Sequence, residues 1–173
     1  AKLLRGRSFQ VSLFAELAAL RILDALSLPP TSQVINAAGK FLLVAPNTPH
    51  VVSELERIRK ELDDWFLKRT FGQAGLGLVW TEACCEDFLR KSRDSGMGFA
   101  ELTRRAWSAL ERAKYQRFGL CDTGGRILEA DFSLGVCKYH GHLPADRPDG
   151  SCAISRDQIE LGQGLVRFDR VLI

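Results

Sequence analysis

Three cysteines and two histidines fall within one stretch of 32 residues, and they are the side chains best suited to hold a metal ion: Cys121, Cys137, His140, His142 and Cys152. The spacing Cys137-x2-His140 is one that zinc loops use, because a short turn brings both side chains onto one tetrahedral ion. Cys121 and Cys152 would complete a site of three thiolates and one imidazole, with His142 as the rival nitrogen ligand. The sequence therefore predicts a structural zinc ion, and the alternative is a loop with free thiols and surface imidazoles.

The cysteines do not form the pattern of a disulfide framework. Their number is five, which is odd, and Cys84 and Cys85 are adjacent, so a reducing cytoplasm is the expected environment. We expect Cys84 and Cys85 to be small buried residues at a helix start rather than ligands. Gly124 and Ser155 occupy the positions where second cysteines of Cys-x2-Cys pairs would fall. The cluster therefore differs from a site built of two such pairs.

A second candidate site is the tip of a short hairpin in the stretch NAAGKFLLVAPNT, residues 36–48. In nucleotide-polymerising palm domains such a turn carries acids that hold Mg²⁺, because phosphoryl transfer needs metal to neutralise developing charge. The tip here is Ala38-Gly39-Lys40, which offers no carboxylate. Asn36 is the nearest polar oxygen, and alone it is a poor Mg²⁺ ligand. The hairpin is therefore predicted to be non-catalytic.

The composition suits a packed globular chain. It has 173 residues, of which 46% are hydrophobic, and no apolar run approaches the roughly 18 residues of a membrane span. The net charge of +3 is too small to indicate nucleic-acid binding. The chain opens without Met, at AKLLRGRSF, so we expect it to be part of a longer polypeptide. Two basic patches are expected to be solvated helix ends: Lys2, Arg5 and Arg7, and Arg112, Lys114 and Arg117.

The first half of the chain alternates helices and strands in an order that indicates an α+β fold. The predicted elements are a helix at 8–27, strands at 34–37 and 41–45, a helix from 48, and a strand at 74–81. Pro29-Pro30 ends the first helix, and Thr48-Pro49 begins the second as cap and first turn. One further strand at the front gives βαββαβ, the ferredoxin-like split unit, which is the architecture of polymerase palms.

The second half is less regular. Residues 99–118 predict an amphipathic helix. Residues 119–164 are rich in glycine, cysteine and histidine, so they can bury little hydrophobic core and need a stabilising element such as a bound metal. Residues 165–173, LVRFDRVLI, predict a closing strand. We therefore expect a degenerate palm at 1–97, followed by a helix and a small Cys/His-rich, zinc-binding module at 98–173.

The ferredoxin-like order of elements also predicts an unoccupied strand position in the middle of the sheet. Its first strand lies in the middle of the sheet, beside the strand expected at 74–81, but the chain begins at the helix that follows. Unpaired backbone groups in such a slot cost about 1–3 kcal/mol for each buried group. We therefore expect a strand from outside the chain to fill it, rather than residues 165–173 or a second copy. Direct pairing of residues 74–81 with the hairpin would contradict the palm assignment.

Three stretches together resemble one protein family: K-x-L-R-G-R-S-F at 2–9, the hairpin AAGKFLLVAPNT, and ELGQGL at 160–165. The sequence resembles the large polymerase-like subunit of type III CRISPR effector complexes, of the Csm type. The resemblance implies a longer chain with an HD nuclease domain, a first palm, a zinc-bearing linker and a second palm whose GGDD hairpin makes cyclic oligoadenylates from ATP. This sequence matches the first palm and the linker, and has neither the HD pair nor the GGDD.

The same resemblance implies a role for the hairpin. The two palms would face each other with ATP and Mg²⁺ between them. The Ala38-Gly39-Lys40 turn would then touch the nucleotide, with Gly39 allowing close backbone approach and Lys40 contacting phosphate. It also implies contacts with other subunits of the complex and, through them, with guide RNA and target RNA. The alternative is a plain turn with an exposed lysine.

Two further functions fit parts of the sequence. A free-standing nucleotide-cyclase-like palm fits the order of elements, but the acid-free hairpin counts against it. A zinc-stabilised RNA-binding module fits the basic patches and would need base-stacking aromatic residues on a sheet face. Phe41, Trp80 and Phe168 are available, but we expect them in the core.

Overall fold

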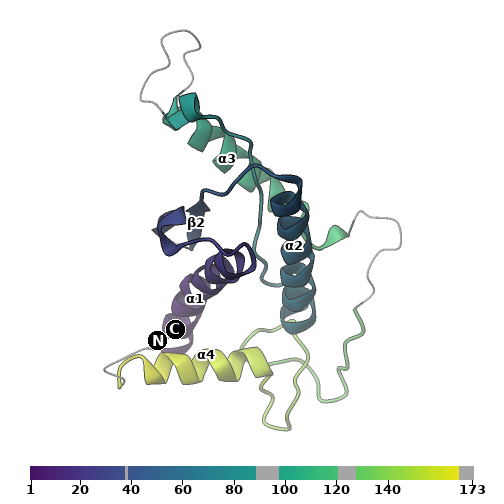
Figure 1. Cartoon of the computed structure of the whole chain (residues 1–173). Helices are drawn as coiled ribbons and strands as arrows, with labels where there is room; N and C mark the ends of the chain where they lie inside the picture. Colours follow the sequence, from purple (N-terminus) through teal and green to yellow (C-terminus); the bar gives the residue numbers. More distant parts are fainter. Residues whose placement is uncertain (38, 89–97, 121–127, 168–173) are drawn as a thin grey trace.

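A computed structural model describes residues 1–37, 39–88, 98–120 and 128–167. Its elements, in chain order, are α1 (Lys2–Ala25), η1 (Pro30–Ser32), β1 (Gln33–Ala37), β2 (Lys40–Leu43), α2 (Pro49–Thr70), η2 (Cys85–Phe88), α3 (Phe99–Ala113), η3 (Arg117–Gly119) and α4 (Ala153–Gly164). α4 crosses the start of α1, and α3 lies at the opposite end of the molecule (Figure 1). The described part is therefore α+β, as predicted, with four α-helices and a two-stranded sheet.

The predicted hairpin is confirmed. β1 and β2 pair antiparallel, with Ala37 opposite Lys40, so the turn contains two residues. Gly39 has a φ of +72°, the left-handed conformation that such turns require and that glycine adopts without strain. A Cβ at this position would also lie 3.0 Å from Val11 Cγ1. Both the turn and the neighbouring α1 therefore favour glycine at position 39.

The start of α2 also follows the prediction. The side chain of Thr48 accepts a hydrogen bond from the backbone N–H of Val51 at 3.3 Å, and Pro49 occupies the first turn. This is the local chemistry that begins helices, because it satisfies an N–H that has no partner within the helix. The helix ends at Thr70 and is capped by Phe71, whose φ of 50° is left-handed.

The predicted strand at 74–81 is wrong for this chain. Residues 75–80 are irregular, and the sheet formed by the described residues contains β1 and β2 alone. A strand exists through hydrogen bonds to a neighbour, and residues 75–80 make no backbone hydrogen bond to any described residue. The βαββαβ order is therefore incomplete at its fourth strand as well as at its first. Direct pairing with the hairpin, the outcome that would have contradicted a palm, does not occur.

Other elements also differ from the prediction, and β2 ends at Leu43 rather than at 45. α1 begins at Lys2 rather than at residue 8, because its first turns pack against α4, which local periodicity does not reveal. α3 ends at Ala113 rather than at 118, and a turn and η3 follow it. Residues 165–167 form a turn after α4 rather than a strand, and residues 168–173 lie outside the described residues.

The core divides into three hydrophobic clusters. α1, α2 and the 74–83 segment share the first, and the second joins the end of α2 to Phe118. The third lies under the loop before α4 and contains Cys137, Leu143 and Cys152. No helix in the described ranges is long and apolar enough to cross a membrane.

The two ends of the chain meet where α1 crosses α4. Gly6 of α1 lies so close to α4 that a Cβ there would overlap the carbonyl oxygen of Gln158. Arg5 donates a hydrogen bond to the carbonyl of Gly162 at 3.0 Å, and Arg7 Nε donates to Gln158 Oε1 at 3.0 Å. The motifs LRGRSF and ELGQGL are therefore the two sides of one helix crossing.

Candidate functional site

The hairpin tip, one of the two candidate sites predicted from the sequence, faces α3. Lys40 Nζ lies 3.8 Å from Glu111 Oε1 and 5.6 Å from the centre of the Trp107 ring. Both charged side chains are about half exposed, so solvent screens the ion pair and Lys40 can exchange this partner for another anion. Gly39 is described next to it, whereas Ala38 lies outside the described residues.

The carboxylates nearest the hairpin are already paired. Asn36 Nδ2 donates to Glu16, and Glu111 accepts from Lys114 Nζ at 2.6 Å. The hydrogen bond from Lys114 holds the pKa of Glu111 below its usual value. No three His, Cys, Asp or Glu residues come together to hold a metal ion in the described ranges. The hairpin therefore offers a backbone turn and a cation, without a carboxylate pair for Mg²⁺.

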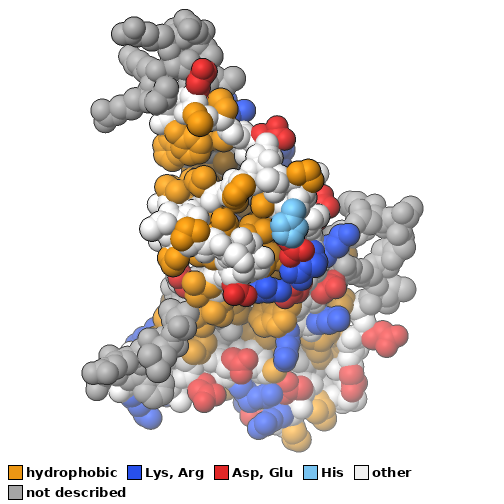
Figure 2. All heavy atoms as spheres, viewed as in Figure 1, with side chains coloured by type: hydrophobic (Ala, Val, Ile, Leu, Met, Phe, Trp, Pro, Cys, Tyr) orange, Lys and Arg blue, Asp and Glu red, His pale blue; other side chains and the backbone are white. Residues whose placement is uncertain are grey.

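A groove of about 950 Å³ opens between β2 and residues 74–83. α1 and α2 contribute to its lining, and so does α3. Figure 2 shows hydrophobic side chains gathered over the upper part of the molecule, where α3 and the hairpin lie. Its apolar lining includes Leu42, Leu76, Leu78, Leu102, Ala106 and Leu110.

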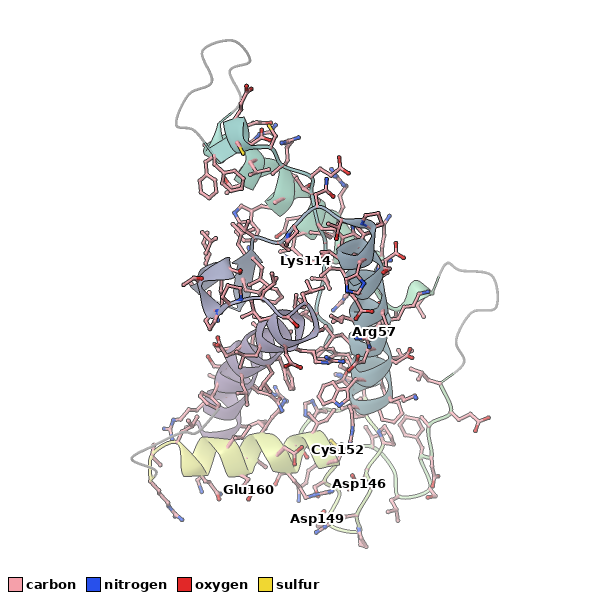
Figure 3. The ribbon with its side chains drawn as sticks, in the orientation of Figure 1. Arg57, Lys114, Asp146, Asp149, Cys152 and Glu160 are labelled. Atoms are coloured by element: carbon pink, nitrogen blue, oxygen red, sulfur yellow. The ribbon has the colours of Figure 1, made fainter. Side chains whose placement is uncertain are left out.

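The cysteine loop, the other candidate site, brings two thiols together around Ser155. Cys137 and Ser155 are fully buried and Cys152 nearly so. Their sulfur atoms lie 3.6 and 3.5 Å from Ser155 Oγ. Ser155 Oγ also accepts from the Cys152 N–H at 3.0 Å, which fixes the start of α4, where Figure 3 labels Cys152. Ser155 therefore lies between the two thiols and contacts both. It occupies the position where a Cys-x2-Cys metal loop has its second cysteine.

The two thiols have different acidities. Burial raises the pKa of Cys137, but the N–H groups of Tyr139 and His140 and the contacts with Ser155 and Cys152 outweigh it, so the pKa lies below its usual value. Burial dominates at Cys152 and raises its pKa. Two backbone N–H groups directed at one sulfur stabilise a thiolate, which is the form that binds metal.

The ring of His140 contacts Arg7 of α1. Arg7 Nη2 lies 3.2 Å from His140 Nδ1, and because arginine only donates, Nδ1 accepts and the ring proton sits on Nε2. That nitrogen is buried without a hydrogen bond of ordinary length among the described residues, although the Gln158 side chain lies close. Burial, and then the charge of Arg7, lower the pKa of His140. In this tautomer Nε2 cannot bind a metal.

The predicted zinc ligands are therefore only partly assembled. Cys137 and Cys152 lie together, the His140 ring is held by Arg7, and His142 is exposed. Cys121 lies outside the described residues. The described residues hold no group of three metal-binding side chains.

The other cysteine prediction is wrong. Cys84 and Cys85 are exposed, not buried. They lie at the start of η2, a single short turn in which Asp87 accepts from the Cys84 N–H at 2.9 Å. One turn has too little surface to cover both side chains.

Several contacts of these sites have no local signal in the sequence. Trp107 and Glu111 reach Lys40 from α3, far along the chain. Ser155 is different, because Cys152-x2-Ser155 repeats the spacing of Cys137-x2-His140 and marks its position.

The family described as Csm1 subunit domain B matches residues 1–126. A curated relative from Thermococcus onnurineus (strain NA1) is named CRISPR system single-strand-specific deoxyribonuclease Cas10/Csm1 (subtype III-A). It is 34% identical over 119 residues, which are 68% of this chain and 15% of that protein.

Solved structures of a Csm1–Csm4 cassette are similar as well. The complex with AMPPNP has 35% identity and a TM-score of 0.61, and the complex with cA4 has 35% identity and a TM-score of 0.62. Each match covers 68% of this chain and 16% of the solved chain. This chain therefore spans about one sixth of the length of these relatives.

Proposed function

Because this chain belongs to the Csm1 subunit domain B family, we propose that it is a non-catalytic palm and linker within the large subunit of a type III CRISPR effector complex. It forms one wall of an ATP pocket, opposite a second palm of the same polypeptide. Its partners are other subunits of the complex and, through them, guide RNA and target RNA. The cassettes solved with AMPPNP and cA4 support the nucleotide role, and their Csm4 subunit supports the contacts with other Csm subunits.

The acid-free hairpin tip is the observation that carries this proposal. The two-residue turn at Gly39 presents backbone without a Cβ, and Lys40 stands beside it as a half-exposed cation. Such a turn binds phosphate through backbone N–H groups and a point charge. The Ala38-Gly39-Lys40 turn therefore binds and orients ATP, while the acids that hold Mg²⁺ come from the other palm.

The domain division belongs to the same proposal. Residues 1–97 form the palm, whose main described elements are α1, β1, β2 and α2. Residues 98–173 form the helix and the linker module. The free thiols of the four described cysteines support a reducing, cytoplasmic location.

A zinc ion in the linker is part of the proposal. Cys137 and Cys152 would supply two thiolates, because their sulfurs already lie together and N–H groups stabilise charge on Cys137. Cys121 would supply the third thiolate. His142 is the better imidazole, since Arg7 holds His140 in a tautomer that blocks Nε2. The ion would fix the loop before α4 in place.

Binding and activity measurements test this function separately. Lys40→Ala in the full-length large subunit should weaken ATP binding about tenfold in calorimetry, whereas Lys68→Ala, an exposed lysine on α2, should not change it. Equal ATP affinity of the Lys40→Ala variant and the unchanged protein would show that the hairpin does not contribute to the ATP pocket.

The 173-residue chain alone should make no oligoadenylate with Mg²⁺ or Mn²⁺. Oligoadenylate produced by this chain would overturn the non-catalytic role.

A further inference from the structure

A second, smaller hollow of about 460 Å³ lies between α2 and the end of α3. Its lining contains three cations, Arg59 and Lys60 of α2 and Arg112 of α3, and one carboxylate, Asp63. We call it the cationic hollow, because these side chains leave an excess of two positive charges there. The net charge of the whole chain is only +3. The fold therefore gathers on one surface cations that lie far apart in the sequence.

The three cations of the hollow are available to a ligand. Each is exposed, and no ion pair that joins two described residues involves any of them. A neighbour on the same helix differs, since Arg57 pairs with Glu54 and Glu61. Cations without a carboxylate partner create a positive potential that attracts an anion, and a phosphate is the anion that arginine and lysine bind best in concert.

One wall of the cationic hollow is aromatic. Trp80 lines it, and the guanidinium carbon of Arg59 lies 5.2 Å from the centre of the Trp80 ring. The Trp80 side chain packs against the first core cluster, as predicted, but it is only partly buried. Tyr115, next to the lining residue Gln116, is 90% exposed. Aromatic rings and arginine planes beside cations are the groups on which the unstacked bases of single strands stack.

We propose that the cationic hollow binds one nucleotide of a single-stranded nucleic acid, with its base against Trp80 and Arg59 and its phosphate at Lys60 and Arg112. This site goes beyond the function proposed above, in which the chain meets RNA only through other subunits. RNA and DNA strands share the phosphodiester and the unstacked base, so these residues specify that chemistry. Because every base has a flat face, binding depends little on which base is present.

Other ligands match only part of this surface. An acidic protein segment would pair with the cations but would bring no flat ring to Trp80. A duplex would offer phosphates while its bases stay stacked inside the helix. A single strand supplies both the charge and the ring, which are the two features that the hollow combines.

Fluorescence anisotropy on the full-length large subunit tests the proposal, with a labelled oligouridine and a labelled oligothymidine as probes. Lys60→Ala and Arg112→Ala should each weaken the binding of at least one probe about tenfold. Each should also reduce the slope of log affinity against log salt concentration by about 0.7, the effect of one lost phosphate contact on a single strand. Lys68→Ala, at an exposed lysine of α2 outside the hollow, should change neither quantity.

The two probes separate the possible sources of the strand. The probe whose affinity falls identifies the strand as RNA or DNA, and an equal loss for both probes means that the hollow accepts either. Unchanged affinity and slope for both variants with both probes would overturn the proposal. So would a full-length protein that binds neither probe.

Variants of Trp80 test stacking separately from charge. Trp80→Leu should weaken the same probe about tenfold, whereas Trp80→Phe, which keeps a ring, should stay within about threefold of the unchanged protein. Because the Trp80 ring also packs against the core, a cross-link in the unchanged protein gives an independent readout. A thio-substituted strand should cross-link to the peptide that contains Trp80, and cross-links found only elsewhere would contradict the site.

The cationic hollow and the ATP pocket can fail independently. Lys60→Ala should keep the ATP affinity of the unchanged protein, and Lys40→Ala should keep its affinity for the strand. If Lys60→Ala weakens the binding of ATP but of neither probe, the hollow is a site for a free nucleotide and the proposal of a strand is wrong.

Discussion

Gly6 of α1 and Gly162 of α4 lie against each other, although they stand near opposite ends of the chain. A Cβ built on Gly162 would come within 3.1 Å of the Gly6 backbone nitrogen and would overlap the carbonyl oxygen of Lys2. A Cβ on Gly6 would overlap the carbonyl oxygen of Gln158. Backbone touches backbone here, so no side chain can rotate away to make room. The crossing of α1 and α4 therefore depends on both glycines.

Gly6→Ala and Gly162→Ala should each destabilise the protein. Inside an ordinary helix, replacing glycine by alanine stabilises by about 0.5–1 kcal/mol. Here the added methyl group meets fixed backbone, and overpacking of this kind costs about 1–3 kcal/mol. Urea denaturation should show a lower free energy of unfolding for both variants. Ser12→Ala, at an exposed position of α1, should change it by less than about 0.5 kcal/mol, and a stabilised Gly6→Ala would contradict the close crossing.

Arg7→Lys should loosen the same crossing. The Arg7 guanidinium donates to Gln158 Oε1 at 3.0 Å, to the Tyr139 carbonyl at 3.4 Å and to His140 Nδ1 at 3.2 Å. A lysine has a single ammonium and cannot make this planar set. Leaving the buried Gln158 oxygen without a donor costs about 1–3 kcal/mol. Thermal denaturation should show a lower midpoint, and Arg69→Lys, at an exposed position on α2, is the control that should leave it unchanged.

Asp146 should make the start of α4 sensitive to acid. The bond from Arg156, and then the N–H of Ala153 at 2.7 Å, hold its pKa below the usual value of 3.8 against a smaller opposing effect of burial. A lowered pKa in the folded state gives stability that is present above the unfolded pKa and is lost as the pH falls through the folded value. Denaturation midpoints should therefore decrease below about pH 4.

Asp146→Asn should remove that part of the acid dependence, because the amide does not titrate. Asp157→Asn, at an exposed position on the same helix, should keep the acid dependence of the unchanged protein. Identical midpoint-against-pH curves for Asp146→Asn and the unchanged protein would show that the Asp146 carboxylate does not hold α4.

Local signals account for the parts of the fold that were predicted from sequence. Gly39 marks the turn and Thr48-Pro49 marks the start of α2, and each needs only its neighbours in the chain. The strand at 74–81 was not obtained, because a strand needs a hydrogen-bonded neighbour and residues 75–80 make no backbone hydrogen bond to any described residue. The sequence supplies the β-prone residues, whereas the partner decides whether they form a strand.

The candidate sites divide in the same way. Cys137 begins a short turn and Cys152 caps the start of α4, and Ser155, at the position that the Cys152-x2-Ser155 spacing marks, lies between the two thiols. The orientation of His140 depends on Arg7, 133 residues away. The spacing of cysteines and histidines along the chain does not predict a contact with Arg7. The choice between His140 and His142 as the proposed zinc ligand therefore requires the structure.

Zinc content should depend on the thiol pair and on His142. Cys137→Ser and Cys152→Ser should each lower the zinc bound by the protein purified without chelator to less than half, because a hydroxyl replaces a thiolate ligand. Cys84→Ser, at an exposed cysteine away from the loop, should keep the full amount. Elemental analysis measures the zinc content of all three variants.

His142→Gln should lower the zinc content, whereas His140→Gln should leave it unchanged, since Arg7 occupies His140 Nδ1. The opposite result would show that the His140 ring turns from Arg7 to the metal, and zinc-free unchanged protein would remove the metal altogether.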